Sequence, residues 1–118
     1  MNQSEFGKLL RNKRQEHHKT QEEIANSINK NKMLISGMET GKNNPPIGDD
    51  LKKMMECLEL NEEEEKEFKI IAALERETLP NELIALVKDD KRIIDILYKI
   101  KEKSLTNEKY EKINKILK

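Results

Sequence analysis

Helix-start signals followed by apolar residues at helical spacing recur along the whole chain. In each of them a Ser, Thr or Asn side chain, which can accept a hydrogen bond from a free backbone amide, precedes apolar residues three or four positions apart. These starts are at Ser4, Thr20, Asn31, Asn61 and Thr106. Thr20 is followed by Glu23, which completes a capping box in which each side chain accepts a bond from the other residue's amide. The recurrence predicts an all-α protein.

The expected helices divide into a longer first part and a shorter extension. Leu, Ile, Met, Lys and Glu are abundant and aromatic residues make up only 3% of the chain, which favours helices over sheets. A chain of 118 residues suits one small domain with an appendage and is too short for a barrel or doubly wound enzyme fold. The break at Leu79-Pro80 separates the two parts. We expect residues 1–78 to form a five-helix domain and residues 79–118 to form a helical C-terminal extension.

The sequence has no feature typical of a membrane protein or an enzyme. No run of about 18 apolar residues occurs, and the single cysteine, Cys57, excludes an internal disulfide and fits a reducing cytoplasm. His17 and His18 are adjacent, so on a helix they point about 100° apart and cannot bind one metal ion in the i, i+4 manner. We find no Gly-rich phosphate loop and no metal-ligand spacing, and we expect no catalytic activity and no cofactor.

The net charge of zero is a cancellation between regions. The chain has 23 basic and 23 acidic residues. Residues 1–45 contain eight Lys and Arg against five Asp and Glu, residues 46–79 five against eleven, and residues 80–118 ten against seven. The regional charges are therefore +3, −6 and +3. A basic first part beside an acidic middle remains compatible with a nucleic-acid partner.

Two short helices separated by a tight turn are expected within the first part, from Gln21 to Ile28 and from Lys32 to Glu39. This spacing predicts a helix-turn-helix, whose second helix can enter a DNA major groove. From Phe6 to about Leu60 the chain resembles the phage-repressor-like (Xre/Cro) helix-turn-helix family. The matching residues are Phe6-Gly7, Leu10-Arg11, Arg14, Thr20-Gln21-Glu22-Glu23-Ile24-Ala25, Ile35-Ser36, Met38-Glu39, Gly41-Lys42, Asn44-Pro45, Leu51, Met54-Met55 and Cys57-Leu58-Glu59-Leu60.

The resemblance implies a set of DNA contacts on and beside the second helix. The implied base contacts are Lys32, Met33, Ser36 and Gly37, and the implied phosphate contacts are Gln21, Lys42, Asn43 and Asn44. Lys32 can donate to guanine, and Met33 can pack on a thymine methyl group. Arg14 and Glu39 match a pair that, in such repressors, ties the first helix to the end of the second helix of the motif.

The function implied is that of a DNA-binding transcriptional regulator that acts as a repressor. We expect a cytoplasmic, nucleoid-associated homodimer on double-stranded DNA with a pseudo-palindromic operator, because one lobe reads only half a site. Two readings of the C-terminal helices stay open: they enlarge the core, or they form a dimer or partner interface. Two other functions also stay open, namely the antitoxin of a toxin–antitoxin pair and a protein-interaction module that kept the fold.

Overall fold

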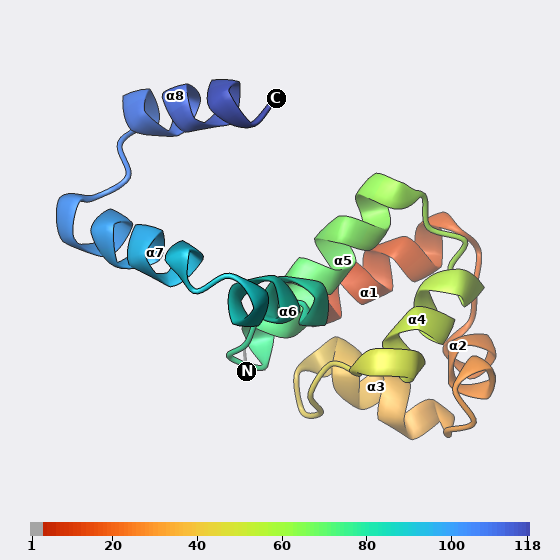
Figure 1. The fold of residues 1–118 in the computed structure, drawn as a ribbon. Helices are drawn as coiled ribbons and strands as arrows, with labels where there is room; N and C mark the ends of the chain where they lie inside the picture. The colour runs from red at the N-terminus through yellow and green to blue at the C-terminus, as the bar shows by residue number, and fades with distance from the viewer. Residues whose placement is uncertain (1–3) are drawn as a thin grey trace. The chain divides into compact units, whose positions relative to one another are not determined.

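The computed structural model describes residues 4–118, and all the regular secondary structure in this range is helical (Figure 1). The prediction of an all-α protein is therefore confirmed for the described residues. The helices are α1 (Glu5–Glu16), α2 (Gln21–Ser27), α3 (Lys32–Thr40), α4 (Gly48–Cys57), α5 (Glu62–Glu75), α6 (Asn81–Asp89), α7 (Arg92–Lys103) and α8 (Asn107–Leu117). None of them is long and apolar enough to cross a membrane.

The helix starts expected from the sequence are present in the structure. The five cap side chains accept bonds from the amides three residues on: Ser4 from Gly7 (2.8 Å), Thr20 from Glu23 (3.0 Å), Asn31 from Leu34 (3.0 Å), Asn61 from Glu64 (2.9 Å) and Thr106 from Lys109 (3.2 Å). The second and fourth of these are complete capping boxes. Such bonds satisfy amides that a helix leaves without an internal partner, so they fix where each helix begins.

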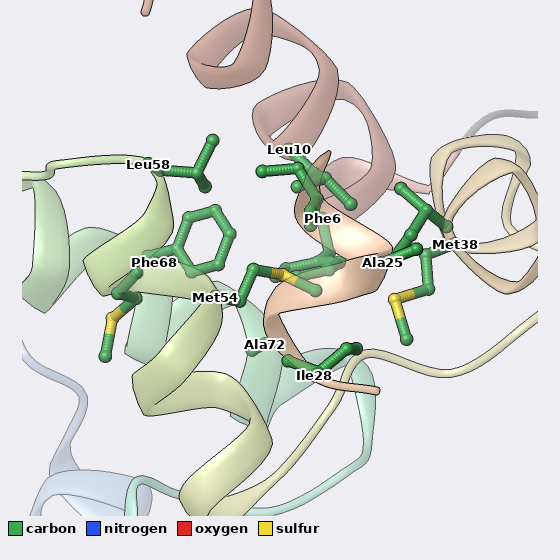
Figure 2. Packing of buried hydrophobic residues seen from close by; sticks show 12 residues of the cluster. Phe6, Leu10, Ala25, Ile28, Met38, Met54, Leu58, Phe68 and Ala72 are labelled. Atoms are coloured by element: carbon green, nitrogen blue, oxygen red, sulfur yellow. The ribbon is translucent and has the colours of Figure 1, made fainter. Parts of the chain in front are cut away.

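The chain divides into two compact units, Met1–Asn81 and Glu82–Lys118. In the first unit α3 packs against α1 and α2, α1 also packs against α5, and α4 packs against α2 and α5. The core between these helices is apolar, and Phe6 of α1 meets Phe68 of α5 edge to face with ring centroids 4.9 Å apart (Figure 2). The buried cluster comprises Phe6, Leu10, Ile24, Ala25, Ile28, Ile35, Met38, Met54, Met55, Leu58, Phe68 and Ala72.

A glycine in α1 allows α1 and α3 to approach closely. A Cβ atom placed on Gly7 would lie 2.4 Å from the backbone oxygen of Glu39 and 2.7 Å from that of Met38. Any larger residue would therefore push the end of α3 away from α1. The close crossing fixes the position of α3 within the first unit.

The second unit has a different character. None of α6, α7 and α8 contains a buried residue. Most of their large apolar side chains are exposed, with Ile116 and Leu117 exposed by 80% and 78%. Apolar residues that recur on one face of a helix normally pack against another surface.

Candidate nucleic-acid interface

Helix α3 (Lys32–Thr40) buries one side and presents the other to solvent. Ile35 and Met38 lie in the core, whereas Lys32 is exposed and Met33 is exposed by 80%. The helix ends at Gly41, which has a φ of 85°, the left-handed conformation that glycine adopts without a steric penalty. The first turn of α3 is thus open to a partner.

A shallow, open groove of about 1030 Å³ runs along the exposed side of α3. It extends from Lys30 in the turn before α3, over Met33 and Ser36, to Lys42 and Asn43 in the loop after α3. No Asp or Glu is among the residues that line it. The groove therefore combines cationic and neutral polar groups, which suits an anionic partner that also offers hydrogen-bonding edges.

The four residues expected to contact bases all lie on α3, but in different surroundings. Met33, Ser36 and Gly37 line the groove, and Lys32 is exposed on the first turn beside it. Gly37 is buried, because the side chain of Asn43 covers it: a Cβ atom at position 37 would lie 2.0 Å from Asn43 Nδ2. The half-buried Asn43 amide therefore occupies the space that a side chain at position 37 would take.

The residues expected to contact phosphate also differ in their surroundings. Lys42 and Asn43 line the groove, and Asn44 is exposed next to them. The Gln21 side chain instead donates from Nε2 to Glu39 Oε1 at 3.1 Å. One of its polar groups is thus already engaged inside the protein.

Arg14 and Glu39 join α1 to the end of α3. Arg14 Nε donates to Glu39 Oε2 at 2.7 Å and Arg14 Nη2 donates to Glu39 Oε1 at 3.1 Å. Arg14 Nη1 also donates to the backbone oxygen of Lys19 at 3.1 Å. Glu39 is only 4% exposed, so this two-point ion pair is what compensates the cost of burying its charge. The pair holds α3 in place from behind the groove.

Five residues that line the groove were not among those expected to contact DNA: Asn29, Lys30, Asn31, Leu34 and Thr40. Asn29 has a φ of 56° and turns the chain between α2 and α3. Lys30 adds a second cation to the groove. It precedes α3 in the chain, whereas Lys42 follows α3. Their positions in the sequence could have indicated them, because they lie beside or within the second helix of the motif and so can contribute to its surface.

A separate polar cluster joins α1 to the first turn of α5. Lys13 Nζ lies 2.9 Å from Glu64 Oε2 and 3.4 Å from Glu16 Oε2, and His17 Nε2 lies 3.7 Å from Glu64 Oε2. The backbone amide of Asn61 and the Lys13 ammonium together lower the pKa of Glu64 from 4.5 to about 2. Candidate metal-ligand atoms of Glu16, His17 and Glu64 lie within 4.8 Å of one another. The Lys13 ammonium already supplies the positive charge there, which makes this cluster an ion-pair network between helices.

Comparisons with known proteins add no relative to this picture. No family model, no curated protein and no solved structure matches the chain. The groove on α3 is therefore the feature on which a function is proposed.

Proposed function

We propose that this chain is a sequence-specific DNA-binding transcriptional regulator in which α1–α5 act as a phage-repressor-like helix-turn-helix domain. The single observation that carries the proposal is the groove along α3, which contains Lys30 and Lys42 and has no acidic residue in its lining. Glu39 is the one acidic residue of α3. It is buried, and its carboxylate is paired with Arg14. An anionic partner therefore meets no repulsive charge along this face.

The dimensions of α3 agree with entry into a major groove. The B-DNA major groove, about 12 Å wide, admits one α-helix. Lys32 would donate to guanine O6 and N7, and Met33 would pack on a thymine methyl group, with Ser36 one turn further along. Lys42, Asn43 and Asn44 would lie on the phosphate backbone and set the register. Gln21 would reach phosphate with the part of its amide that does not bond to Glu39.

The proposed regulator is a homodimer on a pseudo-palindromic operator, and it represses by occupying a promoter on the nucleoid in the cytoplasm. One α3 reads too few base pairs to select a single site. Two copies read two half-sites about one helical turn apart, which multiplies the selectivity.

The test begins with selection of bound sequences from random double-stranded DNA, followed by affinity measurements on the selected site by fluorescence anisotropy. Lys32→Ala is expected to weaken binding by a factor of about 10 and to relax the base preference at one position, since a base contact is worth about 1–3 kcal/mol. Lys42→Ala is expected to weaken binding to all sequences alike and to reduce the salt dependence by about one counterion.

Lys66→Ala is the matched control, because Lys66 is an exposed lysine on α5. It should leave the affinity unchanged. If the protein binds no DNA even at low salt, or if all three variants bind alike, α3 is not a DNA-reading helix and the proposed function is wrong.

A further inference from the structure

Helices α7 and α8 each present an unpartnered apolar stripe, here called the tail stripe. On both helices the apolar residues follow a spacing of three or four positions, which places them on one face. The tail stripe consists of Ile93, Ile96, Leu97 and Ile100 on α7 and of Tyr110, Ile113, Ile116 and Leu117 on α8. Six of these eight side chains are exposed, from 39% for Ile113 to 80% for Ile116, and Ile93 and Ile100 are half-buried.

Helices of this length need an outside surface. α7 has 12 residues and α8 has 11, and isolated helices shorter than about 12–15 residues are only marginally stable in water. Neither helix contains a buried residue. Their stability must therefore come from an apolar surface that covers the tail stripe.

We propose that the tail stripe of a second copy of this chain provides that surface, so that residues 92–117 form the dimer interface. The extent of the exposed surface supports a second copy. Six large apolar side chains of the tail stripe are exposed by 39–80%, which corresponds to an apolar area on the order of several hundred Å² per chain. A standard two-chain interface buries about 800 Å² from each partner, of which about two thirds is apolar in homodimers. This inference rests on the homodimer of the proposed function and names its contact surface.

The charges beside the tail stripe determine how salt affects the dimer. Lys101 lies next to Leu97, and Lys109 and Lys112 lie next to Ile113 and Ile116, at spacings of three or four residues. The acidic Asp95 and Glu102 stand on the opposite side of α7. Lys112 is paired with Glu108 Oε1 at 3.2 Å. Two identical stripes would bring the positive charges of Lys101 and Lys109 together, and added salt screens this repulsion. The dimer should therefore become tighter with salt, whereas DNA binding becomes weaker.

The experiment measures the mass of the full-length chain by sedimentation velocity and light scattering at low and high salt. The expected result is twice 13.9 kDa, with a dissociation constant that decreases as salt increases. Ile113→Asp and Ile116→Asp should each raise the dissociation constant at least tenfold. Lys115→Gln changes the net charge by the same amount on the far side of α8 and should leave the dimer intact. Circular dichroism of the first unit's unfolding transition shows whether each variant remains folded.

Three results would overturn the proposal. They are a monomer at every salt concentration, a dimer that both Asp variants leave unchanged, and association only with vesicles of phosphatidylcholine and phosphatidylglycerol that salt abolishes. Binding of each variant to a DNA fragment that holds one half-site separates the dimer interface from the DNA-binding function. A monomeric variant that still binds the half-site supports the interface. A Lys32→Ala variant that loses DNA binding but remains a dimer bears only on the role of α3 in DNA binding.

Discussion

The side-chain amide of Asn43 lies directly over Gly37. Asn43 Nδ2 donates to the backbone oxygen of Leu34 at 3.3 Å, and the backbone amide of Asn43 donates to the oxygen of Gly37 at 3.0 Å. A Cβ atom on Gly37 would lie 2.0 Å from Asn43 Nδ2. The loop after α3 is therefore fastened to the helix at the one position where the helix has no side chain.

This relationship predicts that the effect of Gly37→Ala depends on residue 43. In the natural chain the added methyl group displaces the Asn43 amide and loses a bond worth about 1 kcal/mol, which roughly cancels the helix-propensity gain of about 1 kcal/mol. In an Asn43→Ala background only the gain remains. A double-mutant cycle by urea denaturation should thus give a coupling of about 1 kcal/mol. Equal effects in both backgrounds would show that Asn43 does not cover Gly37 in solution.

Gly7→Ala should weaken the contact between α1 and α3. The atoms in the way are backbone oxygens of Met38 and Glu39, which cannot rotate aside. We expect a net loss of about 2 kcal/mol in the free energy of unfolding, despite the better helix propensity of Ala. The matched control is Lys8→Ala, one residue further along the same helix and exposed. A variant as stable as the natural chain would argue against the close crossing.

Removal of Arg14 should leave the buried carboxylate of Glu39 without its ion pair. Because Glu39 is 4% exposed, Arg14→Met is expected to cost about 3 kcal/mol. The double variant Arg14→Met/Glu39→Met should recover part of that loss, since no unpaired charge remains. Arg11→Met removes an exposed arginine from the same helix and serves as the control. Thermal and urea unfolding measure all four proteins, and a double variant no more stable than Arg14→Met would contradict the coupling.

The lowered pKa of Glu64 predicts part of the acid sensitivity of the first unit. Its pKa is about 2 in the folded state and 4.5 ordinarily. Its stabilising effect is therefore complete above pH 4.5 and is lost as the pH falls from 4.5 towards 2. Glu64→Gln should lower stability at neutral pH and flatten the pH dependence in that window. Lys13→Met should give an intermediate slope, because the bond from the Asn61 amide remains. Urea midpoints measured between pH 2 and 7 check this, and an unchanged slope for Glu64→Gln would refute it.

The sequence by itself determined the local structure of this protein. The caps at Ser4, Thr20 and Asn61 depend on bonds that span only a few residues. Such bonds form within one segment, so the residue types at fixed spacing are sufficient to predict them. The amphipathic spacing in the same way predicted which side of each helix would be apolar.

Only the tertiary structure decided which distant groups meet. Three contacts join different helices, or a helix to a loop. They are the contact of Asn43 with Gly37, the bond from Gln21 to Glu39 and the ion-pair cluster around Glu64. The tertiary structure also showed that α7 and α8 bury none of their residues, which the sequence had left open. Periodicity gives the apolar face of a helix but not the surface that covers it, because that surface depends on how elements far apart in the chain are brought together.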